Sequence, residues 1–337
     1  MNMARQNNNR RGAALVLAVG LLAIFAALGT TYVAYMTLEQ RRSNDYVAKV
    51  RARQMADSAI WARVGEIQAA LAGGETPAMG PREEELVPVY QKVLAKSTPV
   101  AWERRDGRVL VSVEDESAKL NINHASPRVL QAMLAIDGQL ARTIRSRVPR
   151  PGEAPSKDQQ WFSSVDGLVA RGFLTRDALN QVEPRPGALL TAHSVADNLN
   201  PRAYINVNAA PKEVLAALFN PETAERIVTA RAQQPLKDFA GLLEATQADP
   251  ATFNLEVPAD GAAPTEIAFQ SRSFRIVCTA EARKAGEVQA ACRVEAVVVL
   301  SDTGVAEITY WKEMPAVVEE RETAASGLNT QHPVAES

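Results

Sequence analysis

Residues 13–36 form a run of 24 residues without a single charged side chain. A helix over this run is roughly 36 Å long, enough to cross a hydrocarbon core of about 30 Å. The run therefore predicts a membrane-spanning helix. A secretory signal peptide has a shorter apolar core followed by its cleavage site, whereas here a basic leader with Arg5, Arg10 and Arg11 ends in Gly12 before the run.

The apolar pattern continues beyond this run as a single helical stripe. Its members recur at spacings of three and four residues and are Ala52, Ala56, Ile60, Val64, Ile67 and Leu71. Gly73 and Gly74 then supply a natural helix stop. We predict one helix from about residue 13 to about residue 72, roughly 90 Å long, with its second half packed on a folded domain. An amphipathic linker helix behind a membrane anchor has the same periodicity and stays open as an alternative.

Alternating apolar positions and turn signals predict antiparallel strands in two parts of the chain. The first part is a hairpin of strands near 99–104 and 109–113, joined by a turn at Asp106 and Gly107. The second part is expected to contain three strands and two turns, in the order 273–282, 284–286, 288–300, 302–304 and 305–312. Between the two parts, about 130 residues have the pattern of helices and turns. Residues 75–88, rich in Pro, Gly and Glu, are expected to form a loop.

The region between the two groups of strands contains an internal repeat. Residues 120–130 match residues 205–215 at a constant offset of 85 and share two Asn, one Ala, one Val and one Leu. Each copy continues into a second expected helix and a Gly-Leu pair, at 140–147 and 167–168 in the first copy and at 224–231 and 241–242 in the second. The repeats, 120–168 and 205–242, therefore predict a tandem pair of helical hairpins.

The repeated asparagines are expected to cap the helices that follow them: Asn121, Asn123, Asn206 and Asn208. The second Asn of each pair is placed so that its amide oxygen accepts backbone N–H groups of the first helical turn. The apolar residues after it form the buried helix face. Capping and packing account for every repeated residue, so the repeat does not require catalysis.

The repeat also resembles the helix-hairpin-helix unit of DNA-binding proteins, in which a Gly-x-Gly turn brings backbone amides close to a phosphate. The corresponding turns here are 135–138 and 219–222, and neither contains that cradle. Glu222 would in addition repel a phosphate. Nucleic-acid binding is therefore not expected. A membrane-anchored helix-hairpin-helix DNA-binding protein stays open as an alternative because basic residues remain near the first copy, namely Arg142, Arg145, Arg147 and Arg150.

Composition limits the function classes. The 337 residues exceed one typical domain, and the net charge of −2 argues against a general polyanion binder. The sequence has no nucleophile elbow, P-loop or dinucleotide fingerprint. Its three histidines, His124, His193 and His332, lack metal-ligand spacing. We therefore expect neither enzymatic activity nor a cofactor, and we interpret Trp61 and Trp161 as core or interface aromatics.

The junction before the membrane helix resembles the class III leader of type IV prepilins and type II secretion pseudopilins. In those families a membrane peptidase cuts after the glycine and the new amine is methylated, which implies cleavage between Gly12 and Ala13 and N-methylation of Ala13. The first mature residue is usually Phe or Met, and the fifth is usually Glu but here is Leu17. That Glu is assigned the role of neutralising a neighbouring subunit's amine, so a subunit without it suits a filament tip. An uncleaved signal anchor is the alternative.

The leader without Glu, together with a helical insert in a pilin-like sheet, resembles the K-class minor pseudopilin of type II secretion. The resemblance covers residue 10 to about residue 312 and implies an α+β, type IV pilin-like fold. One departure is that Gln159, Gln160, Trp161 and Phe162 stand where many members carry an acidic Trp-containing motif. The implied parts are a prepilin leader at 1–12, a transmembrane part at 13–36, the amphipathic half-helix and first strands at 37–117, the helical insert at 118–250, the remaining strands at 251–315 and a disordered tail at 316–337.

The resemblance implies a structural subunit at the tip of a type II secretion pseudopilus, supporting protein export across the outer membrane. Its partners would be other minor pseudopilins and the major pseudopilin through the N-terminal helix, the prepilin peptidase and the inner membrane, with the C-terminal domain in the periplasm. A minor pilin of a type IV pilus assembly shares these features and stays open. Calcium, which the family's periplasmic domains can carry, cannot be located, because the acidic run Glu114, Asp115, Glu116 is no ordered ligand set and is interpreted as a solvated turn.

The chain has only two cysteines, Cys278 and Cys292. In a hairpin centred on residue 285 they lie directly opposite each other, since both are seven residues from the centre. An oxidising compartment would allow a cross-strand disulfide closing a loop of about 15 residues, which is the expected state. Two buried free thiols in the hairpin core are the alternative.

Overall fold

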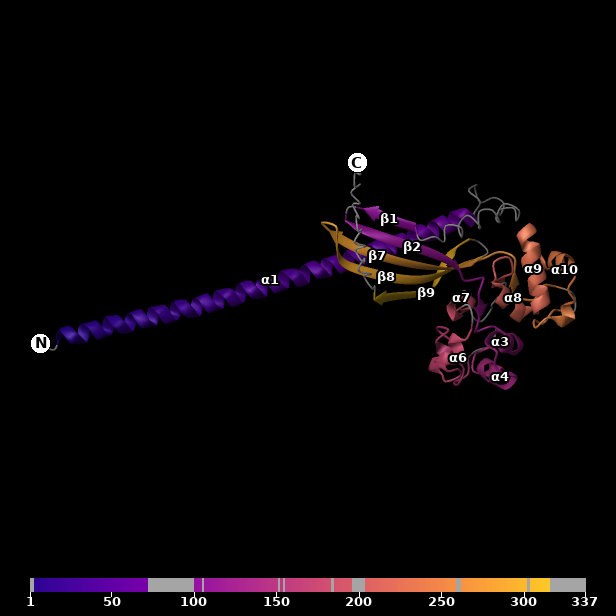
Figure 1. Ribbon diagram of the computed structural model, residues 1–337, viewed down its shortest axis with the longest axis horizontal. Coiled ribbons are helices and arrows are strands. Elements are labelled where there is room, and N and C mark those ends of the chain that lie inside the picture. Colours follow the sequence, from indigo (N-terminus) through magenta and orange to yellow (C-terminus); the bar gives the residue numbers. More distant parts are fainter. Residues whose placement is uncertain are drawn as a thin grey trace, which may run out of the picture.

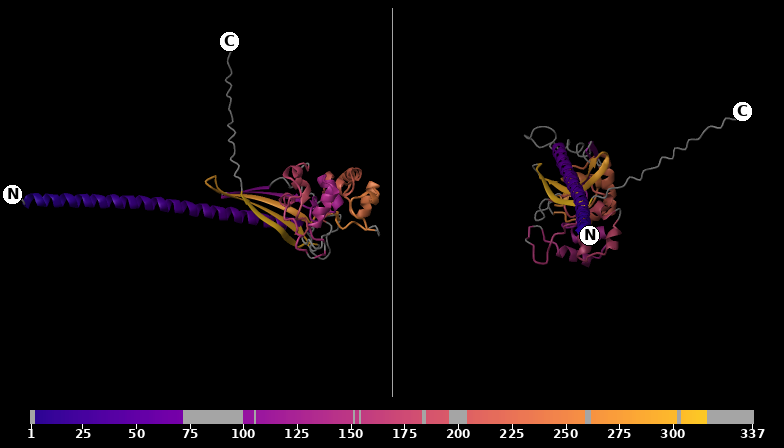
Figure 2. Two further views of the ribbon diagram at one scale, coloured as in Figure 1. Left: turned by 90° about the horizontal axis from the view of Figure 1, so that it is seen from below. Right: turned by 90° about the vertical axis from the view of Figure 1, so that its left-hand side faces the viewer.

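A computed structural model describes residues 3–71, 100–104, 106–150, 152–153, 155–182, 185–195, 204–258, 262–301 and 304–315. The expected loop at 75–88, the expected tail at 316–337 and His332 lie outside these residues. The chain consists of a long helix, a sheet packed on the C-terminal half of that helix, and a helical insert beyond the end of the sheet (Figure 1, Figure 2).

The long helix α1, Met3–Leu71, runs without interruption. It contains no proline, so no backbone hydrogen bond along it is lost for that reason. The predicted apolar stripe is its buried face, since Ala52, Ala56 and Ile60 have no exposed surface and Val64 and Ile67 are 2% and 1% exposed. One long helix whose second half packs on a folded domain is therefore confirmed, but it begins at Met3 and not near residue 13.

The sheet has five antiparallel strands in the order β1-β2-β7-β8-β9. Their bounds are Val100–Arg104, Gly107–Asp115, Ser273–Lys284, Glu287–Leu300 and Ala306–Pro315. Alternate residues of the central strands, such as Val111, Ile276 and Ala296, point toward α1 and form one hydrophobic core with its stripe. The predicted α+β, pilin-like fold is confirmed.

The register of the β7–β8 hairpin differs from the expected one. The turn has two residues, Ala285 and Gly286, both with positive φ (53° and 89°), as in a type I′ turn. A bulge between Ala282 and Arg283 then shifts the pairing by one more residue.

This shift corrects the prediction for the two cysteines. Cys278 pairs with Val294, and Cys292 pairs with Ala280, so the two residues are diagonal neighbours rather than directly opposite. Both still point into the core beside α1, because the displacement equals one side-chain period of a strand. Both are free thiols, and burial raises the pKa of Cys278 to about 12 and of Cys292 to about 11. The expected disulfide is therefore absent from the hairpin.

The insert, residues 116–272, connects β2 to β7. Its helices are α3 Pro127–Leu134, α4 Gly138–Ser146, α5 Gly167–Ala170, α6 Arg176–Asn180, α7 Pro186–Leu189, α8 Lys212–Leu218, α9 Pro221–Gln233 and α10 Phe239–Thr246, with a 3-10 turn, η1, at Pro250–Thr252. Two short parallel pairs join β3 Leu120–Asn121 to β4 Leu190–Thr191, and β5 Ile205–Asn206 to β6 Ile267–Ala268. Because β6 pairs with β5, the insert extends well past its expected end at residue 250.

The insert has its own hydrophobic core, separate from the core between α1 and the sheet. It lies at the end of the sheet that is farthest from the N-terminus of α1 (Figure 1, Figure 2). The membrane-type segment and the insert therefore occupy opposite ends of the molecule.

Candidate functional site

No described part of the chain covers the apolar part of α1. Its large side chains are strongly exposed, from 72% at Val16 to 48% at Met36. A window of 18 residues in this segment has a mean hydropathy of 2.2 and none of it is buried, so by length and composition the segment can span a membrane. We therefore describe the chain as membrane-anchored. Gly12 and Ala13 lie within α1, and their cleavage and methylation stay predictions.

Beyond the membrane segment, α1 also exposes an aromatic side chain. Trp61 is 56% exposed although it lies in the half of α1 that packs on the sheet. It is therefore available to an interface and does not belong to the core. Trp161, in contrast, packs against the core of the insert, with its ring 5.4 Å from that of His124.

In the first copy of the repeat, the two asparagines bind backbone segments together. Asn121 accepts a hydrogen bond from Asn123 N (2.9 Å) and donates to Ser194 Oγ (3.0 Å). Asn123 accepts from Phe162 N (2.8 Å) and donates to the carbonyls of Phe162 (3.0 Å) and Ala192 (3.2 Å). The loop after α4 and the strand β4 are thereby fixed to the start of the hairpin.

The second copy repeats this arrangement bond for bond. Asn206 accepts from Asn208 N (3.0 Å) and donates to Ser271 Oγ (2.8 Å). Asn208 accepts from Leu236 N (2.9 Å) and donates to the carbonyls of Leu236 (2.8 Å) and Phe269 (2.9 Å). The two copies are therefore one structural unit used twice.

The expectation that these asparagines cap helices is wrong. The N-cap of α3 is Ser126, whose hydroxyl accepts from Val129 N (3.3 Å), and the N-cap of α8 is Pro211. The asparagines stand too far upstream, in β3 and β5 and in the turns after them. Asn123 and Asn208 bind distant backbone instead, whereas Asn121 and Asn206 bind the local turn and a serine hydroxyl.

Ser194 and Ser271 are the partners that sequence reasoning missed. They lie at an offset of 77 residues, whereas the asparagines lie at an offset of 85. Each follows a closing strand, β4 or β6, that pairs with the first strand of its own copy. Each repeat unit therefore ends at its serine. The serine that follows the closing strand in both copies is the sequence signal that could have revealed this partner.

In the turns between the hairpin helices, side chains of the protein occupy the place where an anion would bind. In the first copy, Asp137 caps α4 and its carboxylate accepts from Gln139 N (2.8 Å) and Leu140 N (2.9 Å). In the second copy, the Asn220 side chain accepts from Thr223 N (2.8 Å) at the start of α9. In each copy, backbone amides at the start of the second helix, where a phosphate would bind, therefore already have a side-chain partner.

The arginines near the first copy are partly structural. Arg145 donates to the carbonyls of Val148 and Pro149, both at 3.1 Å, and burial lowers its pKa. Arg150 pairs with Glu153 at 3.8 Å. Arg142 and Arg147 are exposed. The four side chains therefore do not form a common anion site.

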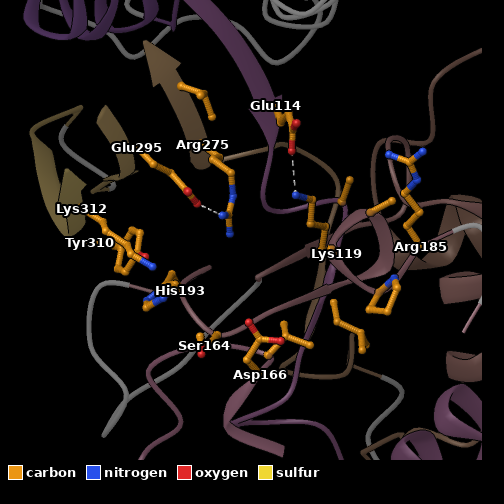
Figure 3. Close-up of a pocket in the computed structure, with 18 of the residues that line it drawn as sticks. Glu114, Lys119, Ser164, Asp166, Arg185, His193, Arg275, Glu295, Tyr310 and Lys312 are labelled. Carbon is orange, nitrogen blue, oxygen red and sulfur yellow. Dashed lines mark hydrogen bonds and ion pairs between the residues drawn. The ribbon is translucent and has the colours of Figure 1, made fainter. Parts of the chain in front are cut away.

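A buried ionic cluster joins the insert to the sheet. Glu116 has no exposed surface and contacts both Lys119, at 2.8 Å, and Arg275. Arg275 also contacts Glu295, and Lys119 reaches Glu114 at 3.0 Å (Figure 3). Burial alone would raise the pKa of Glu116, but the two cations outweigh it and the pKa is lowered. The carboxylate is therefore held in its charged form at the junction.

The interpretation of residues 114–116 as a solvated turn is therefore wrong. Glu116 is buried in the cluster, and Asp115 accepts from Ser117 N (2.9 Å) and from the Ser271 hydroxyl. Asp115 thus links the end of β2 to the second copy of the repeat. Within the described ranges, no group of three or more His, Cys, Asp or Glu residues could hold a metal ion.

His193 makes a second contact between the insert and the sheet. Its ring lies 4.3 Å from that of Tyr310 on β9, and the Thr309 hydroxyl donates to its carbonyl at 3.5 Å. Burial lowers the pKa of His193, and the nearby Arg275 acts in the same direction. The imidazole is therefore a neutral packing group at pH 7.

Two comparisons with known proteins found a match, one to a family and one to a fold. The family described as type II secretion system protein K matches residues 205–258, which make up most of the second copy of the repeat. A chain in the crystal structure of the GspK–GspI–GspJ complex from the type 2 secretion system of enterotoxigenic Escherichia coli matches with a TM-score of 0.53 and 15% identity, over 82% of this chain and 100% of that chain. At this identity the likeness shows the fold. A search of the curated proteins found no match. The predicted resemblance to the K class is confirmed.

Proposed function

We propose that this chain is a minor pseudopilin of the K class of the type II secretion system and the subunit at the tip of a periplasmic pseudopilus, which the family match and the similar fold support. The proposal includes cleavage between Gly12 and Ala13, methylation of Ala13, insertion of α1 in the inner membrane and a periplasmic sheet and insert. The chain would act as a structural part and not as an enzyme.

The observation that carries this proposal is the position of the insert. It lies at the end of the sheet opposite to the exposed apolar part of α1 (Figure 1). A filament of this kind grows by adding subunits along the N-terminal helices. If the end of a subunit that is far from the membrane is covered, new subunits can be added only on its membrane side. An insert beyond the sheet supplies that cover, and its width would also limit growth through an outer-membrane channel.

The partners proposed for α1 are helices of sibling subunits. Exposed apolar residues at 16–36 need lipid before assembly and neighbouring helices afterwards. Leu17 carries no charge to pair with the terminal amine of a neighbour, which fits a subunit with neighbours on one side only. Because the similar structure contains GspK with GspI and GspJ, we propose siblings of the I and J type as the direct partners.

Processing is tested by the intact mass of the protein extracted from membranes of its native host. We expect loss of residues 1–12 and the mass of one added methyl group. Gly12→Val should retain the leader, because the peptidase requires the small residue at the cut. Gly20→Ala is the matched control, since nothing lies within 4 Å of an added Cβ there. A wild-type chain that keeps its leader would contradict the prepilin pathway.

The tip position is tested by immunogold labelling of sheared pseudopili with an antibody to the insert. We expect one label per filament, at an end, and copurification of the I-type and J-type siblings with the tagged chain. Labels spaced along the shaft would show that the chain is an ordinary shaft subunit.

A further inference from the structure

A cleft of about 930 Å³ lies between the sheet and the first copy of the repeat. One wall is the face of the sheet that points away from α1, with Arg293 and Lys312 on β8 and β9. The other wall belongs to the insert and carries Arg185, just before α7, and Asp166. In Figure 3, Arg185 and Lys312 stand on opposite sides of the cleft, with Lys119 between them.

The carboxylates of this cleft are already paired within the protein. The contacts are Glu114 with Lys119, Glu295 with Arg275, Asp166 with Arg176, and Asp115 with Ser117 N and the Ser271 hydroxyl. Each negative charge at the walls is thus engaged before any ligand arrives.

Three cations of the same walls are left over. Arg185, Arg293 and Lys312 are exposed, and none forms an ion pair within the part of the chain that the structure describes. Lys312 stands opposite Glu295 in the strand register, but Glu295 is held by Arg275. The unmatched charge of the cleft is therefore positive and is divided between its two walls.

We propose that this cleft binds an acidic, extended segment of another protein. Carboxylates of that segment pair with Arg185 on one wall and with Arg293 and Lys312 on the other. One wall of the cleft is the sheet face that points away from α1, so the site is distinct from the helix contacts of the proposed function. The cleft would allow the tip subunit to bind a negatively charged segment of a partner protein.

Charge distribution favours a peptide over a nucleic acid. A nucleic acid carries a charge on every nucleotide, so some phosphates would lie against the ion pairs of Glu114, Asp166 and Glu295, which offer no unmatched positive charge. A peptide needs carboxylates only where the three unmatched cations stand. A segment with spaced carboxylates therefore fits the three unmatched cations better than a continuous polyanion does.

The test uses the full chain in neutral detergent micelles and a fluorescein-labelled peptide in which three glutamates are separated by glycines, with binding followed by fluorescence anisotropy. We expect saturable binding that weakens with salt. The triple variant Arg185→Glu, Arg293→Glu, Lys312→Glu should bind at least about tenfold more weakly, because three favourable charge pairs become repulsive. The corresponding Gln triple should fall between the two.

The matched control reverses three exposed arginines of the first copy outside the cleft, Arg128, Arg142 and Arg147. It has the same net charge as the Glu triple, and we expect an affinity within about twofold of the wild type. Thermal melts confirm that each variant is folded. Absence of saturable binding, an equal loss in the control, or displacement of the peptide by a duplex DNA oligonucleotide would each overturn the proposal. The measurement does not involve the pseudopilus, so either result leaves the proposed function to its own tests.

Discussion

Asn123 is a fully buried amide whose three side-chain hydrogen bonds all go to the backbone of the insert. Asn123→Ala would leave the N–H of Phe162 and the carbonyls of Phe162 and Ala192 without their partner. Buried groups that lose a partner cost about 1–3 kcal/mol each, and partial relaxation makes the sum smaller. We expect a loss of about 3 kcal/mol in the free energy of unfolding, measured by chemical denaturation in micelles.

The control for this prediction is Asn180→Ala, at the exposed end of α6. It should change the unfolding free energy by no more than about 0.5 kcal/mol. If Asn123→Ala changed the unfolding free energy equally little, the buried amide would not contribute to the stability of the repeat.

Glu116 links stability to pH. Its pKa is lowered below the ordinary value of 4.5 because Lys119 and Arg275 outweigh the effect of burial. The stability from its charged form is therefore complete above about pH 4.5 and is lost as pH falls through the lower folded-state pKa. Glu116→Gln should lose roughly 3 kcal/mol at pH 7, because two cations lose a buried partner.

The same substitution should flatten the pH dependence. Thermal midpoints measured between about pH 3 and pH 7 should fall less steeply on the acid side in Glu116→Gln than in the wild type. Glu153→Gln is the control, because its pair with Arg150 is exposed and long at 3.8 Å, and its profile should follow the wild type. Parallel wild-type and Glu116→Gln profiles would mean that other groups control acid stability.

Among the elements, the helix and the sheet strands could be predicted because each is long enough to show its period. The β7–β8 register could not, since it depends on a two-residue turn and a bulge after Ala282 that leave the apolar alternation unchanged. The strands β3 to β6 have two residues each and show no period at all.

The functional residues divide in the same way. The repeated asparagines were visible because they share one offset, but Ser194 and Ser271 were not, since connecting segments of unequal length change the offset. The role of Glu116 depends on Arg275, which is 159 residues away, and local sequence cannot show that they meet.

Helix α1 meets the β1–β2 hairpin at Gly107. A Cβ there would lie 2.3 Å from Met55 Cε and 2.6 Å from the Glu281 carbonyl oxygen, and the carbonyl belongs to a paired strand that cannot easily move. Gly107→Ala should therefore destabilise the protein by about 1–3 kcal/mol. Gly65→Ala, within α1 with nothing inside 4 Å, should instead stabilise it by up to about 1 kcal/mol through helix propensity. Opposite shifts of the denaturation midpoint check both effects, and a neutral Gly107→Ala would show that α1 packs loosely at this hairpin.

On the scale of the whole molecule, the insert is a separable unit. Its core does not merge with the core between α1 and the sheet. Its two ends also lie together, because Glu116 N and Ser117 N both donate to the Ser273 carbonyl, at 2.9 and 3.3 Å. The strands β2 and β7 on either side of it are direct neighbours in the sheet.

A chain in which residues 118–271 are replaced by a short Gly-Ser linker should therefore keep the pilin-like part. We expect a cooperative thermal transition, membrane insertion and leader removal as in the wild type. If the insert is what ends the filament, this chain without the insert should fail to support export. The same linker inserted between Gly152 and Glu153, two exposed residues of the insert, leaves the insert in place and should preserve export. A chain without the insert that folds, is processed and supports full export would show that the tip position does not depend on the insert.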